Sequence, residues 1–219
     1  SSISGGTTVV TVGEQGTILT SADDGDTWTP RVSGTTAWLT AVCYDYRSGH
    51  FIAVGDGGTI LSSPDGIAWQ REAAPTTLRL NAVTVGPAND VWAVGEAGVG
   101  LLVREANGVW ARHDVGFGSR WLRGLTDSMA VGEAGANFRS DSALDQSTPW
   151  QIVPTPTATD LEAVTRGGRS GTLSNAMVAV GADGVILERD LSGTGWNLRP
   201  SGTTQRLRGV CWRFGGGMT

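Results

Sequence analysis

Residues 11–28 read TVGEQGTILTSADDGDTW, and residues 53–69 read AVGDGGTILSSPDGIAW. In both stretches an apolar segment ends in a Val-Gly pair, an acidic turn and a second short apolar strand follow, and a Trp closes the pattern. The pair recurs five times, at Val12-Gly13, Val54-Gly55, Val94-Gly95, Val131-Gly132 and Val180-Gly181. An internal repeat of this kind decides the fold of a chain before any other feature.

Two further markers recur with the same period. A Trp follows each second strand, at Trp28, Trp69, Trp110, Trp150 and Trp196. A Leu-x-[Ala/Gly]-[Val/Leu] strand comes next, beginning at Leu39, Leu80, Leu122, Leu161 and Leu207. The 219 residues therefore divide into five units of about 44 residues. Each unit holds four short segments of strand composition, bounded by turn-forming residues, and no helical period of comparable length.

Four-stranded units of roughly 40–45 residues are typical of propeller blades, so we predict an all-β, five-bladed β-propeller of four-stranded antiparallel blades. The sequence opens on the second strand of a unit, at residues 7–12, and ends on a first strand, at residues 206–214. We expect the C-terminal strand to pair with the N-terminal strands and close the ring, which would hide the sheet edges. One domain then spans residues 1–219, with blades at 1–34 plus 205–214, 37–74, 78–115, 120–154 and 159–200. A β-sandwich is the alternative fold.

The repeated Gly and Trp have structural interpretations. We expect the Gly after each Val to adopt a positive φ or to allow another backbone segment to approach closely. We expect the repeated Trp to seal one blade against another, because it begins each outer strand and carries a large apolar ring. A ligand-binding role is the alternative for the Trp residues.

Composition argues against several classes of function. All 16 basic residues are Arg, so the lysine of a Walker-type phosphate loop is missing. The net charge of −5 and the lack of a basic block argue against nucleic-acid binding. No apolar run approaches the ~18 residues of a membrane span, and residues 1–6 do not have the pattern of a signal peptide. The spacing of Cys43, Cys211, His50 and His113 is unlike that of zinc ligands, so we expect no metal and no cofactor.

Residues 21–28, SADDGDTW, match the Asp-box Ser-x-Asp-x-Gly-x-Thr-Trp, and a shortened copy occurs at residues 63–69. The residues of the two boxes are Ser21, Asp23, Gly25 and Trp28, and Ser63, Asp65, Gly66 and Trp69. The chain thereby resembles the bacterial neuraminidase (BNR) repeat proteins, and the longer string at residues 12–28 looks most like the photosystem II assembly and stability factor family and its non-photosynthetic bacterial relatives. This resemblance implies a protein partner and an extracytoplasmic location, periplasmic or secreted.

The Asp-box is interpreted as a turn motif. Its Ser and Asp side chains suit hydrogen bonds to turn backbone, and its Gly allows the hairpin geometry. Calcium or glycan binding by the box is the alternative.

No catalytic constellation is evident in the sequence. A sialidase needs an arginine triad, a Tyr nucleophile paired with Glu, and an acid/base Asp. The two tyrosines, Tyr44 and Tyr46, lie at the end of one predicted first strand, and the Phe-Arg-Ile-Pro motif of sialidases is missing. Nucleophile elbows, metalloprotease helices and Cys-x-x-Cys pairs are also missing. We therefore expect a protein that is not an enzyme.

A candidate binding site follows from the blade geometry, because the loops entering the first strands and leaving the second strands share one face of a propeller. The positions before each first-strand Leu are Trp38, Arg79, Trp121, Asp160 and Arg206, and the positions after it include Asn81, Arg123, Glu162 and Arg208. The acidic turns should lie farther out. Trp and Arg are enriched at protein-binding hot spots, and indole faces also suit sugars. Alternatively, Arg123, Glu162 and Arg208 neutralise one another in a polar channel.

The predicted function is a non-enzymatic binding or assembly scaffold that binds a protein partner on this face. A carbohydrate-binding lectin is the alternative, and a sialidase-type glycoside hydrolase is a third possibility. We expect a monomer. Cys43 and Cys211 occupy equivalent places in two first strands, so they either form a disulfide across the ring closure or remain buried free thiols.

Overall fold

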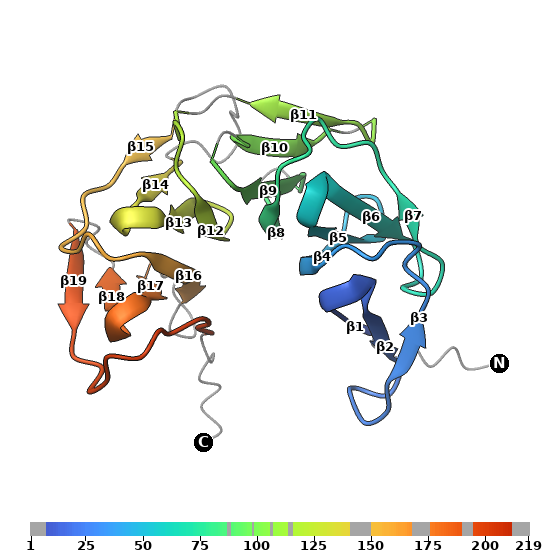
Figure 1. Cartoon of the computed structure of the whole chain (residues 1–219), viewed down its shortest axis with the longest axis horizontal. Helices are drawn as coiled ribbons and strands as arrows, with labels where there is room; N and C mark the ends of the chain where they lie inside the picture. The colour runs from blue at the N-terminus through green and yellow to red at the C-terminus, as the bar shows by residue number, and fades with distance from the viewer. Residues whose placement is uncertain are drawn as a thin grey trace, which may run out of the picture. The chain divides into compact units, whose positions relative to one another are not determined.

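The computed structural model describes residues 8–86, 89–97, 99–105, 107–113, 116–140, 150–167, 176–189 and 195–211. These residues form antiparallel sheets, and short 3-10 turns connect some of the strands within a sheet (Figure 1). The first sheet holds β1 (Val9–Val12), β2 (Ile18–Ser21) and β3 (Thr29–Arg31). The second holds β4 (Leu39–Asp45), β5 (His50–Gly55), β6 (Thr59–Ser63) and β7 (Gln70–Arg71), and the third holds β8 (Leu80–Val85), β9 (Val91–Gly95), β10 (Leu101–Arg104) and β11 (Trp110–His113). The fourth holds β12 (Leu122–Leu125), β13 (Met129–Gly132), β14 (Asn137–Arg139) and β15 (Gln151–Ile152), and the fifth holds β16 (Leu161–Gly167), β17 (Ala176–Gly181), β18 (Ile186–Arg189) and β19 (Trp196–Arg199).

Each sheet is a meander in which strands consecutive in the chain pair with one another. The five sheets correspond to the five predicted repeats, and four of them have the expected four strands. The all-β prediction is therefore confirmed. No helix in the part of the chain that the structure describes is long and apolar enough to cross a membrane.

The chain divides into two compact units. Unit 1 is Ser1–Gly95 with Leu102–Arg112, and unit 2 is Glu96–Leu101 with His113–Thr219. Each unit has its own apolar core. In unit 1, Ile18 from the first sheet packs with Leu39, Ala53 and Leu61 from the second. In unit 2, a cluster that includes Met129 and Val131 of the fourth sheet packs with Leu161, Met177, Ala179, Leu187 and Trp196 of the fifth.

The first strand of each four-stranded sheet is held in the same register. Leu39 lies opposite Gly55, Leu122 opposite Gly132 and Leu161 opposite Gly181. The register of β4 shifts directly after its Leu, between Leu39 and Ala41, and the other first strands shift at the matching place. This β-bulge interrupts the two-residue alternation of a regular strand between the positions before and after the Leu.

In four of the five Val-Gly pairs, close backbone approach rather than a positive φ requires the Gly, and Gly13 is the exception. Gly55 has a φ of −175°, which is ordinary extended backbone. A Cβ built on Gly55, Gly95, Gly132 or Gly181 would lie only 2.0–2.2 Å from the backbone carbonyl oxygen of the residue that precedes the first-strand Leu. A positive φ occurs instead in the turn that follows, at Gln15, Gly57, Ala134 and Asp183. Close backbone approach and a positive φ were alternatives for one Gly, and the structure shows them at two positions that lie two residues apart.

The repeated Trp residues pack as predicted, with one exception. Trp110, Trp150 and Trp196 are buried, and Trp69 packs against the core of unit 1. Trp28 is 41% exposed. Its sheet is the first in the chain, so unit 1 contains no preceding sheet to cover it.

The predicted closing strand is not formed in the residues that the structure describes. Residues 206–211 adopt no strand, residues 212–214 lie outside the described ranges, and the first sheet has three strands. Closure of the ring and a single domain over residues 1–219 therefore stay predictions.

Candidate functional site

In unit 1 the structure brings together two of the predicted site residues. Trp38 lies directly before β4 and Arg79 directly before β8, and these strands contact each other. The Arg79 guanidinium carbon lies 4.8 Å from the centroid of the Trp38 ring, a cation–π contact. Arg79 also forms an ion pair with Asp56, with 3.2 Å between its Nη1 and the carboxylate Oδ1. The side chain of Trp38 is held in place on one side and remains 44% exposed.

In unit 2 four more predicted residues form a connected ion network. Arg123 reaches Asp160 at 3.1 Å and Glu162 at 3.6 Å, and Arg206 also pairs with Glu162. Asp160 additionally accepts a hydrogen bond of 3.0 Å from the backbone N–H of Ala134. The proposed neutralisation of Arg123 and Glu162 is therefore observed, and Arg206 is the second cation that pairs with Glu162.

Trp121 stands at the edge of this network. It is 40% exposed, and its backbone N–H points toward Glu133 Oε2 at 3.4 Å. Asn81 is half-buried in β8, and Arg208 is exposed. The predicted residues are divided between the two units, so their arrangement as one ring stays a prediction.

Two acidic residues, which the sequence analysis placed farther out, also belong to these clusters. Asp56 and Glu133 each open a short turn, η2 (Asp56–Gly58) and η3 (Glu133–Gly135). Their backbone N–H groups donate to the carbonyls of Trp38 and Trp121, both at 2.9 Å. The turn therefore lies against the position before the first strand. The five-fold recurrence of an acidic residue after Val-Gly is the signal that could have placed it there.

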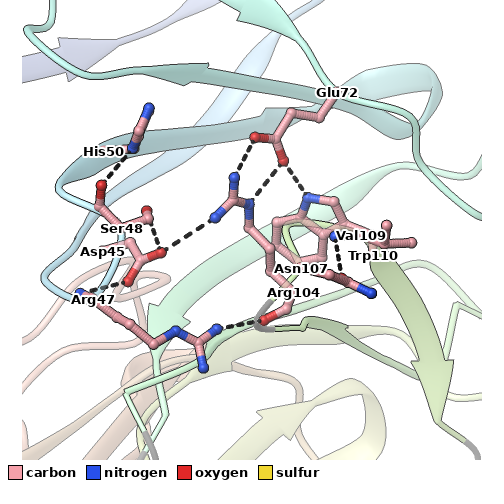
Figure 2. Close-up of polar contacts among 9 residues, drawn as sticks. All are labelled: Asp45, Arg47, Ser48, His50, Glu72, Arg104, Asn107, Val109 and Trp110. Atoms are coloured by element: carbon pink, nitrogen blue, oxygen red, sulfur yellow. Dashed lines mark hydrogen bonds and ion pairs between the residues drawn. The ribbon is translucent and has the colours of Figure 1, made fainter.

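A second polar cluster in unit 1 joins the second and third sheets (Figure 2). Arg104 of β10 donates to both carboxylate oxygens of Glu72, at 2.8 and 3.0 Å, and lies 3.4 Å from Asp45. Trp110 donates its indole N–H to Glu72 at 2.6 Å. Asp45 is fully buried and is also bonded by Ser48. Burial raises the pKa of Glu72, but hydrogen bonds from Arg104 and Trp110 outweigh it and leave that pKa below its usual value.

The two Asp-box turns are closed by their own side chains. Asp23 accepts hydrogen bonds from the Thr27 N–H and hydroxyl at 2.9 and 2.6 Å, and Ser21 accepts one from the Gly25 N–H at 2.8 Å. Hydrogen bonds from Ser21 and Thr27 lower the pKa of Asp23 to about 2.

The shorter box uses the same chemistry. Asp65 accepts from the backbone N–H groups of Ile67 and Ala68, and Ser63 accepts from that of Gly66. The N–H groups of Ala68 and Ile67 lower the pKa of Asp65. Across the described ranges, no group of three or more His, Cys, Asp or Glu side chains could hold a metal ion.

The tyrosines and cysteines have local surroundings that differ from an acid/base or redox pair. Tyr44 packs edge-on against both Tyr46 and Phe51, with ring centroids 5.2 and 4.8 Å apart. Cys43 and Cys211 are free thiols in the structure, and a disulfide between them stays a prediction. Burial, with a contribution from the charge of Asp45, raises the pKa of Cys43 to about 12.

By sequence, the chain matches no protein-family model and no curated protein. Its structure is similar to YCF48 from Cyanidioschyzon merolae, with a TM-score of 0.68 and 15% identity over 94% of this chain and 71% of that one. It is also similar to YCF48 bound to D1 peptide, with a TM-score of 0.59 and 19% identity over 86% of this chain and 62% of that one. A third similar structure is virginiamycin B lyase from Staphylococcus aureus, with a TM-score of 0.62 and 14% identity over 89% and 70% of the two chains.

These likenesses establish the fold class. The chain has a fold of the β-propeller type, built from antiparallel sheets. One of the similar structures is a peptide complex and another is a lyase, so the fold is compatible with binding and with catalysis.

Proposed function

We propose that the chain is a non-enzymatic protein-binding module that takes an extended peptide segment on the positions before its first strands. The observation that carries the proposal is the exposed indole of Trp38, held by Arg79, which is itself oriented by Asp56. Indoles and guanidiniums are the side chains most often found at binding hot spots, and fixing them in advance lowers the entropy cost of association.

The surroundings of Trp38 favour a peptide over a sugar. A sugar stacks its C–H face on an open indole face, but the Arg79 guanidinium already lies over the ring of Trp38. A peptide can use the exposed rest of the indole and hydrogen-bond to the turn backbone. The D1 peptide bound to YCF48 supports this choice, because it shows that a similar propeller binds a peptide.

We further infer that the chain is a propeller of the Asp-box type. Support comes from the closed turns at Ser21–Trp28 and Ser63–Trp69, in which Ser and Asp side chains hold the turn backbone. These carboxylates are occupied by hydrogen bonds within their own turns, which favours a structural role for the box over ligand binding.

The binding proposal is tested with a random peptide library displayed on phage and selected on the immobilised chain. Selected peptides are then titrated calorimetrically against the native chain and Trp38→Ala. Loss of a hot-spot aromatic costs about 2 kcal/mol or more, which corresponds to a roughly 30-fold weaker affinity.

Tyr46→Ala is the matched control. Tyr46 is an aromatic side chain with 77% exposure, and it follows the opposite end of β4 from Trp38. Its removal should leave the affinity within about twofold. Failure to select peptides, or equal binding by Trp38→Ala, contradicts the proposal, and binding on a glycan array in that case would indicate a lectin.

A further inference from the structure

Trp38 and Trp121 are two exposed indoles that occupy the same place in two repeats. Each precedes the Leu that opens a first strand, β4 or β12, and the two residues are 44% and 40% exposed. The carbonyl of each Trp accepts a hydrogen bond of 2.9 Å from the backbone N–H of the acidic residue that opens the next turn, Asp56 or Glu133. The backbone therefore places an indole and an acidic side chain at equivalent positions in unit 1 and in unit 2.

Unit 1 shows which group binds between such an indole and such a carboxylate. The guanidinium carbon of Arg79 lies 4.8 Å from the centroid of the Trp38 ring, and its Nη1 lies 3.2 Å from Asp56 Oδ1. Arg79 comes from the position before β8, the first strand that contacts β4. Trp38, Asp56 and Arg79 are therefore an arginine-binding arrangement within the chain itself.

Unit 2 has the indole and the carboxylate but a different residue in the place of Arg79. The position before β16, the first strand that contacts β12, is Asp160. The carboxylate of Asp160 bonds to Arg123 at 3.1 Å and accepts from the backbone N–H of Ala134 at 3.0 Å. Among the residues that the structure describes, no Arg lies over the ring of Trp121.

Glu133 supplies the charge beside this open indole. Its side chain is exposed, and its Oε2 lies 3.4 Å from the backbone nitrogen of Trp121. In the described part of the chain no cation forms an ion pair with Glu133, whereas its counterpart Asp56 pairs with Arg79. A carboxylate next to an exposed indole attracts a cation through its charge and through the quadrupole of the ring.

We propose that Trp121 and Glu133 bind an arginine side chain of the protein partner, whose guanidinium takes the place over Trp121 that Arg79 takes over Trp38. The inference rests on the proposed function, because the arginine belongs to the bound peptide, and it names the chemistry of one residue of that peptide. A planar guanidinium stacks on an aromatic face and pairs with a carboxylate at once, which an ammonium group does less well.

Charge distinguishes this ligand from a sugar, the other group that stacks on an open indole. A sugar would cover the ring of Trp121 without compensating the charge of Glu133, whereas a guanidinium does both. The net charge of −5 also favours the approach of a basic partner.

The first test probes the site directly with N-acetyl-arginine amide. Its neutral isostere, N-acetyl-citrulline amide, is the matched control ligand. In NMR spectra of the isotope-labelled native chain, the indole signal of Trp121 is identified by its loss in Trp121→Phe. This signal should shift saturably with the arginine compound and require a roughly 10-fold higher concentration of the citrulline compound. Equal responses to the two compounds, or no response to either, overturn the proposal.

Glu133→Gln tests the role of the carboxylate. The substitution keeps the size of the side chain and removes its charge, so the response to the arginine compound should fall to that of the citrulline compound. Asp127→Asn is the matched control, because it removes the same charge from unit 2 and Asp127 follows the opposite end of β12 from Trp121. It should leave the response within about twofold. A Glu133→Gln chain that still prefers arginine contradicts the proposal.

The arrangement in unit 1 allows a test by gain of a site. Arg79→Ala removes the guanidinium from the ring of Trp38 and leaves Asp56 without that cation. The indole signal of Trp38 should then also respond to N-acetyl-arginine amide, which it should not do in the native chain. A Trp38 signal that stays unchanged in Arg79→Ala would show that an indole beside this turn does not bind arginine, and would overturn the proposal.

Peptides selected on the chain separate this inference from the proposed function. Replacing arginine by citrulline in such a peptide should weaken its affinity for the native chain by roughly 10-fold and leave its affinity for Trp121→Ala unchanged. Peptides that require Trp38 but bind equally well with arginine or citrulline would overturn the inference and leave the proposed function standing. A selection that yields no peptide contradicts the proposed function, and the NMR titration then decides on the arginine site alone.

Discussion

Glycines at different positions of the repeated turn differ in how well they tolerate substitution. Gly132→Ala should lower the free energy of unfolding by about 2 kcal/mol, because the methyl group would lie 2.0 Å from the Trp121 carbonyl and the backbone must shift. Gly57→Ala should cost less than about 1 kcal/mol. Its φ is +64°, but its Cβ would meet nothing, and the chain itself places Ala134 at the equivalent position with a φ of +53°. Urea unfolding of both variants checks this ranking, and equal losses would contradict it.

The carboxylate of Asp23 gives the fold a pH dependence of known sign. Its pKa of about 2 in the folded state lies below the ~3.9 of an unfolded Asp, so its hydrogen bonds stabilise the fold fully above about pH 4. This contribution is lost as the pH falls through 2. The stability difference between the native chain and Asp23→Asn should therefore be present at pH 6 and close near pH 2.

The titration itself supplies a direct check on Asp23. The side-chain carboxyl resonance should titrate near pH 2 in the folded chain by NMR. A midpoint near 4 would mean that the bonds from Ser21 and Thr27 do not persist in solution.

At the residue scale, the sequence predicted which residues belong to the candidate site better than it predicted the contacts that they make. Trp38 and Arg79 were assigned to one face from their position before a first-strand Leu, and they do touch. The ion pair of Asp56 with Arg79 was missed, because the bulge after Leu39 and the turn η2 set its place, and neither has a signature in single residues.

The second and third sheets are joined by buried charge. Arg104→Ala should lower the free energy of unfolding by about 3 kcal/mol, because it leaves the fully buried Asp45 and the carboxylate of Glu72 without their cation. Urea unfolding measures this loss.

Arg199→Ala is the control for this element-scale prediction. Arg199 pairs with Glu188 across two exposed strands, with side-chain exposures of 55% and 37%, so its removal should cost less than about 1 kcal/mol. Similar losses in both variants would show that the ion pairs of Arg104 do not join the sheets.

Strands that belong to the repeat could be predicted from the sequence, whereas a side-chain cluster that is not repeated could not. The strands follow three markers that each recur five times, so a single alignment of the sequence with itself locates them. The cluster of Asp45, Glu72 and Arg104 occurs in one place only, and its members lie 32 and 59 residues from Arg104. Nothing in their local sequence distinguishes them from exposed charges.

For the whole molecule, the ring closure predicted from the sequence can be tested by truncation. If the C-terminal strand predicted at residues 206–214 pairs with the N-terminal strands, a chain ending at residue 204 should unfold at a midpoint lower by on the order of 10 °C, because a strand and its pairing are lost. A chain ending at residue 214 keeps the predicted strand and should match the full chain in a calorimetric scan. An unchanged midpoint in the shorter chain would contradict the predicted closure.

At this scale, the sequence predicted the number of repeats and the all-β fold, and ring closure stays a prediction. Closure depends on a strand whose partner is about 200 residues away in the chain. The local pattern predicts a first strand at residues 207–211, but pairing over such a separation is a property of the assembled sheets.

Gly55, Gly95, Gly132 and Gly181 each lie against the residue before a first strand, and the contact is made to the backbone carbonyl of that residue. Every amino acid supplies the same carbonyl, so the frame imposes no requirement on the side chain that projects from that residue. Trp, Arg and Asp already occupy the position in different repeats. The candidate recognition residues at this position can therefore be replaced one at a time while the backbone of the sheets stays the same, as the framework of an antibody stays the same while its hypervariable loops vary.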